Sequence, residues 1–128
     1  MLSIKEEDYL RAIFLHENNG TKSIDIAREL KISKASVSEM LKKLAKRKLI
    51  TLKPYSRVYL TEKGESLASE IFRKHRVARE FMKNILKSEN QDALKQAHNL
   101  EHAFSLENIE KLEKIMKGKR VIAPTYIG

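Results

Sequence analysis

Two short amphipathic segments between positions 23 and 48, separated by three residues, restrict the fold of this chain more than any other feature. In "SIDIAREL" (23–30) apolar residues recur at helical spacing, and "KIS" then interrupts the pattern. A second helix is predicted from about Lys34 to Lys48, with Ser33 as its N-cap. The predicted apolar faces are Ile24, Ala27 and Leu30 on the first helix and Val37, Leu41 and Leu44 on the second. Two helices joined by a tight turn form a helix-turn-helix, which is typical of DNA-binding domains.

The segment that follows predicts a two-stranded hairpin. In "LITLKPYSRVYLTEKG" (49–64), apolar residues alternate on both sides of a turn that contains Pro54. A hairpin in this position is the wing of a winged helix-turn-helix. The N-terminal segment "IKEEDYLRAIFLHENNG" (4–20) predicts one more helix, which packs behind the helix-turn-helix and stops at Asn19 and Gly20. Its predicted contact residues are Tyr9, Leu10, Ile13 and Phe14.

Basic residues are concentrated in the same region. Residues 31 to 63 contain ten Lys or Arg and two acidic residues, in a chain of 128 residues with a formal net charge of +9. A basic run is often only a solvated surface, but here it coincides with the winged helix-turn-helix pattern and predicts double-stranded DNA as the partner. Ser36 and Glu39 are expected to face bases, and Lys42, Lys53 and Arg57 to face phosphates. The full set of candidate DNA-binding residues is Lys34, Ala35, Ser36, Ser38, Glu39, Lys42, Lys53 and Arg57.

After Gly64 the sequence changes to long amphipathic helices. They are predicted at about 65–87, from about Gln91 onward, and at 106–118, where Gly118 ends the last one. The predicted fold is therefore mainly α, with a winged helix-turn-helix domain at 1–64 and a helical domain at 65–128. The second domain has more apolar surface than three helices cover, including Phe81, Met82, Ile85, Leu86 and Phe104. Packing on the winged domain is one explanation; a homodimer on a palindromic operator is the favoured one.

The stretch "QAHNLEHAFS" (96–105) places His98, Glu101 and His102 on one helical face, at spacing i, i+3, i+4. His75 lies on the preceding helix, which a short connection leaves antiparallel to this one. The order H-x-x-E-H also matches inverted zinc proteases, in which the glutamate activates water. Only 26 residues follow His102, and half of the chain forms a DNA-reading head. No enzyme activity is therefore expected, and a small zinc hydrolase is kept as the alternative.

Composition limits the type of metal site and the compartment. The chain has no cysteine, so a metal ion must be held by nitrogen and oxygen ligands. No apolar run approaches the length of about eighteen residues that a membrane span needs, and the N-terminus becomes acidic too early for a secretory signal. A cytoplasmic protein without a membrane partner or a small-molecule substrate is predicted.

Five segments together resemble one family of transcriptional regulators. "EDYLRAIF", "SIDIARELKISKASVSEMLKKLAKRKLI", "LTEKGESLA", "FRKHRVARE" and "NLEHAFS" are similar to segments of the metal-dependent repressors related to the diphtheria toxin repressor and the manganese-transport regulator. The match runs from about Glu7 to Ser105. The resemblance implies a DNA-binding homodimer that represses metal-uptake genes when its divalent ion is bound. The chain ends where longer members continue into a small barrel domain, so the resemblance implies the short form.

The resemblance also implies the metal ligands. Asp8 falls where the manganese branch has aspartate and the iron branch methionine. His98 falls where the iron branch has cysteine and the manganese branch glutamate, while Arg11 and Arg79 replace acidic ligands of the family. The implied ligand set is Asp8, His75, His98, Glu101 and His102.

Three imidazoles and two carboxylates suit Fe(II), Co(II) and Zn(II). The family favours Fe(II) or Mn(II) as the physiological ion, with Co(II) or Zn(II) binding in vitro. Asp8 lies in the predicted DNA-binding half and the other four ligands in the helical half, so one ion held by all five would clamp the halves together. A metal-independent winged-helix regulator is a further alternative, which leaves Asp8 without a role.

Overall fold

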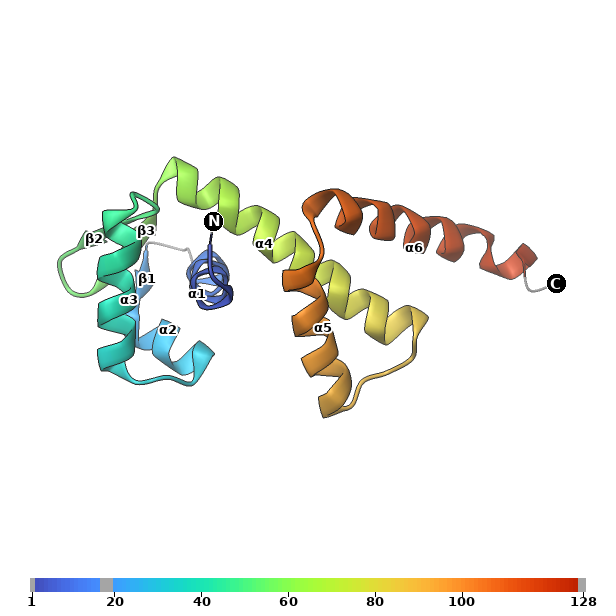
Figure 1. The fold of residues 1–128 in the computed structure, drawn as a ribbon, viewed down its shortest axis with the longest axis horizontal. Coiled ribbons are helices and arrows are strands. Elements are labelled where there is room, and N and C mark those ends of the chain that lie inside the picture. The colour runs from blue at the N-terminus through green and yellow to red at the C-terminus, as the bar shows by residue number, and fades with distance from the viewer. Residues whose placement is uncertain (1, 17–19, 127–128) are drawn as a thin grey trace. The chain divides into compact units, whose positions relative to one another are not determined.

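The computed structural model describes residues 2–16 and 20–126, and the chain is mainly α-helical (Figure 1). Its contacts divide it into two compact units, Met1–Phe72 and Arg73–Gly128, called the first and the second unit below. The predicted fold class, a winged helix-turn-helix followed by a helical part, is confirmed. The elements in chain order are α1 (Ile4–Leu15), β1 (Thr21–Lys22), α2 (Ser23–Leu30), α3 (Lys34–Lys46), β2 (Ile50–Lys53), β3 (Arg57–Leu60), α4 (Glu62–Glu80), the π-helical η1 (Phe81–Ile85), α5 (Gln91–Ala103) and α6 (Leu106–Tyr126).

The first unit has one continuous apolar core, to which α1, α2, α3 and the sheet all contribute. The predicted stripe of α3 is buried as expected. On α2, Ile26 and Ala27 are buried, whereas Ile24, which we expected in the core, is 41% exposed. The reason is the helical period: Ile26, Ala27 and Leu30 share one face, and Ile24 lies about 200° away from Ile26. The largest fully buried side chains of this core include Leu10, Ile13, Ile26, Leu44 and Leu49.

The predicted wing is confirmed as an antiparallel hairpin of β2 and β3, in which Ile50 pairs with Leu60 and Lys53 with Arg57. The sequence did not predict β1, which adds two residues to the other edge of β3 and gives the sheet order β1-β3-β2. A strand of two residues has too few positions to show an alternating pattern. Gly20 precedes it with φ of +85°, and an added Cβ there would lie 2.6 Å from the Tyr59 ring. Glycine is therefore required where the chain enters the sheet.

Helix α1 is shorter than predicted, because it ends at Leu15 and not at Asn19 and Gly20. Thr21 Oγ1 lies 2.9 Å from the Ile13 carbonyl oxygen and 3.1 Å from that of His16. The Thr21 hydroxyl is thus a hydrogen-bond partner for carbonyl groups at the end of α1, and the helix ends early. Asn19 itself lies outside the described residues.

Helix boundaries after the wing also differ from the prediction: the helix expected at about 65–87 is α4, which ends at Glu80, followed by the π-helical η1, which ends at Ile85. Helix α4 begins at Glu62, where Thr61 Oγ1 accepts a hydrogen bond from the Gly64 N–H at 3.1 Å. Gly64 fits because an added Cβ would lie 1.9 Å from the Leu49 carbonyl oxygen. Helix α6 does not end at Gly118 but extends to Tyr126. A glycine within a helix costs only about 1 kcal/mol relative to alanine, so it is a weak stop signal.

Among the residues whose side chains are described, the second unit has only small apolar clusters. Ala78, Met82, Ala93 and Ala97 form one small buried cluster, and Val77, Ile109 and Met116 form another. Of the apolar residues predicted to need a cover, Met82 is buried and Leu86 and Phe104 are exposed. Up to Gly118, the exposed large apolar residues of this unit are Leu86, Leu94, Phe104 and Ile115. Across the part of the chain that the structure describes, no helix combines the length and apolar character of a membrane span.

Candidate functional site

Helix α3 presents a polar outer surface because its sequence separates apolar and polar residues cleanly. Ser33 is the N-cap, as predicted, and its Oγ accepts a hydrogen bond from the Ser36 N–H at 3.1 Å. With Val37, Leu41 and Leu44 directed into the core, the opposite side of the helix faces solvent. All six candidate DNA-binding residues of this helix are exposed: Lys34, Ala35, Ser36, Ser38, Glu39 and Lys42.

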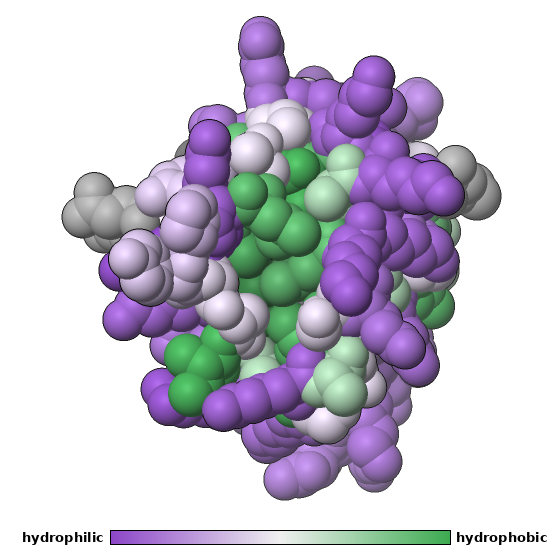
Figure 2. Space-filling view, turned by 90° about the vertical axis from the view of Figure 1, so that its left-hand side faces the viewer, coloured by the Kyte–Doolittle hydropathy of each residue, from purple (hydrophilic) through white to green (hydrophobic). Residues whose placement is uncertain are grey.

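The structure divides these residues between two flanks of α3. Lys34, Ser38 and Lys42 line a groove of about 450 Å³ between α3 and the wing, together with Lys53. Ser36 and Glu39 line a cavity on the other flank, next to α1. Figure 2 shows a face of the molecule on which hydrophilic side chains surround an apolar strip.

Lys46 was not among the predicted DNA-binding residues. It is exposed one turn beyond Lys42, and its i+4 spacing from Lys42 could have identified it.

The wing tip is exposed and basic, but its two candidate cations differ. Lys53 is exposed, whereas Arg57 is half-buried and donates a hydrogen bond from Nη1 to the Gly20 carbonyl at 3.3 Å. Between them, Tyr55 and Ser56 have φ of 63° and 59°, and Tyr55 is 94% exposed. Positive φ at two consecutive non-glycine residues is uncommon and fixes a sharp turn at the tip. Lys53 is thus freer to contact a phosphate than Arg57.

A buried ion pair fixes α1 against the end of α3. Glu6 is 3% exposed; its Oε2 accepts a hydrogen bond from Arg47 Nη1 at 2.6 Å and its Oε1 accepts one from the Ser3 N–H at 2.9 Å. Burial alone would raise the pKa of Glu6, but the hydrogen bonds from Ser3 and Arg47 outweigh it and lower the pKa. The carboxylate is therefore charged at neutral pH and holds the two helices together.

Asp8 lies on α1, two residues after this ion pair. Its side chain is 19% exposed, and its Oδ1 lies 3.9 Å from Arg11 Nη2. Arg11 thus forms an ion pair with Asp8, three residues before it on the same helix. Arg11 Nε is buried without a hydrogen-bond partner among the described residues.

In the second unit, His75 on α4 and Glu101 on α5 come together. His75 Nδ1 lies 2.8 Å from Glu101 Oε1, a hydrogen-bonding distance. The Glu101 side chain is only 1% exposed. Its other oxygen, Oε2, is buried and has no partner within the described ranges. Because a buried carboxylate oxygen without a partner is costly, this atom calls for a proton or a cation.

The other two candidate ligands form a second pair on α5. His98 Nε2 lies 3.3 Å from His102 Nε2, and the rings meet edge to face with centroids 4.6 Å apart. Two facing imidazole nitrogens attract each other only if a proton or a cation lies between them. Nitrogen and carboxylate oxygen ligands of this type suit divalent transition metals, so the donor set of this unit fits such an ion.

A buried carboxylate also fixes the part of α4 that contains His75. Glu113 on α6 is 5% exposed and accepts hydrogen bonds from Arg73 at 2.7 Å and Arg76 at 2.9 Å. The two guanidinium groups outweigh the effect of burial and lower the pKa of Glu113 to about 2. Arg73 and Arg76 lie on either side of His75 in the sequence, so this cluster sets the orientation of α4 at the ligand.

The fold and these side chains define a class: a winged helix-turn-helix protein whose helical second unit contains clustered metal-ligand types. Comparison with known families is consistent with that class. The family model described as the N-terminal DNA-binding domain of iron-dependent repressors matches residues 1–58. The one described as their metal-binding and dimerisation domain matches residues 61–121. The chain belongs to the iron-dependent repressor family, as its sequence resemblance predicted.

Individual relatives agree with this assignment. An uncharacterised HTH-type transcriptional regulator of Methanocaldococcus jannaschii is 37% identical over 114 residues, which are 87% of this chain and 91% of the relative. The transcriptional regulator MntR of Escherichia coli is 32% identical over 106 residues, 81% of this chain and 68% of the relative. A solved structure of the manganese regulator SloR is 35% identical with a TM-score of 0.74, over 88% of this chain and 53% of that one. The chain thus spans about half the length of this solved relative.

Membership of this family decides between the predicted classes of function. The family consists of metal-dependent transcriptional regulators, so the chain is a regulator and not an enzyme. The zinc-hydrolase alternative, based on His98, Glu101 and His102, is rejected.

Proposed function

We propose that this protein is a metal-dependent repressor of genes for metal-ion homeostasis, activated by Fe(II) or Mn(II). The observation that supports it most directly is Glu101, a buried carboxylate with one oxygen next to His75 and the other without a partner in the described chain. Such a group is stabilised by a cation. The paired histidines on the same helix supply further ligands.

The proposed ligands are Asp8 from the first unit and His75, His98, Glu101 and His102 from the second. The ion would neutralise the two carboxylates and accept lone pairs from the imidazoles. Imidazole ligands favour Fe(II), whereas carboxylate ligands favour Mn(II). The similar protein SloR, a manganese regulator, supports Mn(II) as the other candidate. Co(II) and Zn(II) are expected to bind in vitro.

Asp8 is the ligand through which the metal ion would control DNA binding. It lies on α1, and the Glu6–Arg47 ion pair fixes α1 to α3. Coordination through Asp8 would therefore fix the orientation of the DNA-contacting helix relative to the dimerising part. Apparent DNA affinity rises with the fraction of time that the two heads are correctly spaced. A hundredfold preference for the DNA-competent arrangement corresponds to about 2.7 kcal/mol.

On DNA, we propose that α3 enters the major groove and the wing contacts the backbone. Ala35, Ser36, Ser38 and Glu39 have side chains short enough for close approach to bases, while Lys34, Lys42 and Lys53 suit phosphates. Arg57 remains a weaker candidate for phosphate contact, because its guanidinium already donates to the Gly20 carbonyl.

A homodimer with two-fold symmetry is the proposed assembly, on an imperfectly palindromic operator. The exposed apolar side chains of the second unit support it, above all Phe104 at 37% and Ile115 at 64% exposure. We also propose a functional boundary at Gly64, with residues 1–64 for DNA and 65–128 for metal binding and dimerisation. Action on chromosomal operators implies a cytoplasmic location.

The test is DNA binding measured with and without metal. A duplex selected from random sequence by the metal-loaded protein serves as the operator, and affinity is measured by fluorescence anisotropy in EDTA and in Fe(II), Mn(II), Co(II) and Zn(II). The wild type should gain about a hundredfold in affinity with Fe(II) or Mn(II). Glu101→Ala should lose both the ion, measured by calorimetry, and the gain. Equal affinity in EDTA and in every metal would favour the metal-independent regulator instead.

A further inference from the structure

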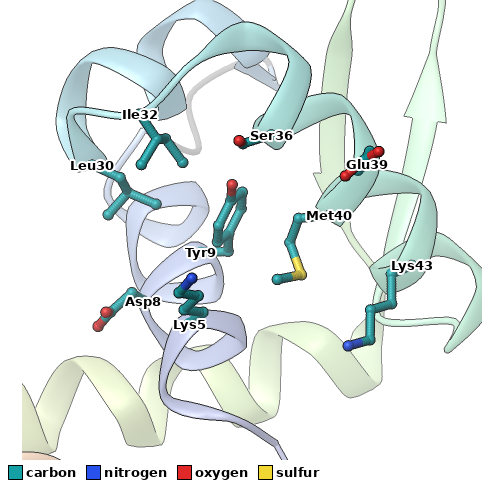
Figure 3. A pocket seen from close by; sticks show the side chains of 9 residues that line it. All are labelled: Lys5, Asp8, Tyr9, Leu30, Ile32, Ser36, Glu39, Met40 and Lys43. Carbon is teal, nitrogen blue, oxygen red and sulfur yellow. The ribbon is translucent and has the colours of Figure 1, made fainter.

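A cavity of about 510 Å³ lies between α1 and α3 within the first unit (Figure 3). Its volume is within the range of about 300–1,000 Å³ that is typical of small-molecule sites. Lys5 and Tyr9 line it from α1, Ser36 and Lys43 from α3, and Leu30 and Ile32 from the end of α2 and the turn that follows. Asp8, one of the proposed metal ligands, also lines this cavity.

Tyr9 is the residue that points to a ligand. It is 5% exposed, yet its hydroxyl has no hydrogen-bond partner among the residues that the structure describes. Figure 3 shows the hydroxyl directed into the space beside Ile32 and Ser36. A phenol hydroxyl can donate a hydrogen bond to an acceptor in the cavity. The hydroxyl oxygen itself is reached from the cavity, so it can donate to an acceptor that enters from outside the chain.

The unpaired charges around the cavity favour an anion. Neither Lys5 nor Lys43 has an ion-pair partner in the described residues, whereas Asp8 is compensated by Arg11 at 3.9 Å. Glu39 contributes one further negative charge, so the uncompensated lining charge is positive. The remaining walls are the half-buried apolar side chains of Leu30, Ile32 and Met40.

We propose that this cavity binds a small organic carboxylate with a short apolar body. Its carboxylate accepts from the Tyr9 hydroxyl and pairs with the lysine ammonium groups, while its body packs on Leu30, Ile32 and Met40. Because Ser36 and Lys43 belong to α3, an occupant places negative charge next to the DNA-facing helix and opposes duplex binding. This makes the first unit responsive to a second signal besides the metal ion.

The test is an NMR titration of the metal-free, ¹⁵N-labelled full chain with phenylacetate. Phenylacetamide, which has the same body without charge, and acetate, which has the charge without the body, are the matched probes. Phenylacetate should give saturable shifts around Tyr9, Ile32 and Lys43 with a millimolar Kd, and the two probes should bind at least about fivefold more weakly. Absence of saturation, or equal binding of phenylacetamide, would overturn the proposal.

Variants locate the site. Tyr9→Phe removes only the hydroxyl and Lys43→Gln only the charge, and each should weaken phenylacetate binding about fivefold. Lys46→Gln, an exposed lysine on the same helix outside the cavity, is the control and should change nothing. If Lys46→Gln weakens binding equally, the effect is one of net charge and the proposal is wrong. It is equally wrong if only duplex DNA, and not phenylacetate, shifts these amides, because the lysines then belong to the phosphate contacts.

Discussion

The two units of this chain bury different kinds of side chain. The first unit encloses thirteen buried apolar residues in one core, whereas the second has two clusters of four and three. Against these smaller clusters the second unit buries two carboxylates, Glu101 and Glu113, whereas the first unit buries one, Glu6, which Arg47 compensates. Apolar burial is self-sufficient, but buried charge needs compensation from arginine, a metal ion or a proton. The first unit therefore rests mainly on its apolar core and compensates its one buried carboxylate internally, whereas the second unit leaves Glu101 Oε2 without a partner among the described residues.

The largest effect is expected from a cavity in the first core. Leu44 is fully buried on α3, so Leu44→Ala should lower the free energy of unfolding by about 2–5 kcal/mol. Urea denaturation followed by circular dichroism measures it. Ile24→Ala, at a residue that is 41% exposed on the neighbouring α2, is the control and should cost about 0.5 kcal/mol or less. Similar losses for both variants would contradict a single apolar core.

A smaller effect, with a pH signature, is expected at the buried carboxylate of the second unit. Glu113→Gln should cost about 1–3 kcal/mol, because a charged hydrogen-bond acceptor of Arg73 and Arg76 is lost. The pKa of Glu113 is lowered to about 2 from an ordinary value of 4.5. Its contribution is therefore complete above pH 4.5 and disappears as pH falls from 4.5 towards 2. Melting curves of the two proteins should converge over this window; a constant difference would contradict the ionic role.

The exposed apolar residues of the second unit should matter for assembly more than for folding. Ile115→Asp on α6 is expected to raise the dimer dissociation constant at least about tenfold, or about 1.4 kcal/mol, with the helical content unchanged. Analytical ultracentrifugation measures it. Lys114→Ala changes the charge by the same amount at the neighbouring residue and is the control. An unchanged dissociation constant for Ile115→Asp would place the interface elsewhere.

The smallest effect is expected on the wing. Lys53→Ala should weaken binding to all duplexes alike and reduce the slope of log affinity against log salt by about 0.9, the value for one phosphate contact. Arg57→Ala should reduce the slope less, because its guanidinium is already engaged by the Gly20 carbonyl. Anisotropy titrations at several salt concentrations distinguish the two. A larger change for Arg57→Ala would reverse the assignment.

The sequence predicted the elements whose signals are local. The helix-turn-helix, the hairpin and the stripe of Val37, Leu41 and Leu44 follow from periodicity and capping residues, and the structure confirms them. Two helix ends were not predictable. Thr21, eight residues after Ile13, contacts the carbonyl oxygen of Ile13 where α1 ends. Gly118 is too weak a stop signal, and α6 continues through it. The strand β1 is recognised only from its pairing with β3, which the local sequence does not indicate.

The candidate site divides in the same way. The spacing of His98, Glu101 and His102 on one helix was evident from the sequence, and so was their helical face. The contact of His75 with Glu101 depends on how α4 packs on α5, and the Arg73–Glu113–Arg76 cluster depends on α6. No local pattern reports such pairings between helices, since the partners lie 26 to 40 residues apart.

The most direct test of the proposed clamp is operator affinity as a function of metal concentration for Asp8→Ala. The variant should remain a folded dimer and bind an ion through the second unit, measured by calorimetry on the same sample. Its DNA affinity should stay at the metal-free value, while the wild type gains about a hundredfold. Glu7→Ala, at the adjacent carboxylate on α1, should respond as the wild type does. A full metal-dependent gain by Asp8→Ala would show that metal control of DNA binding does not pass through α1.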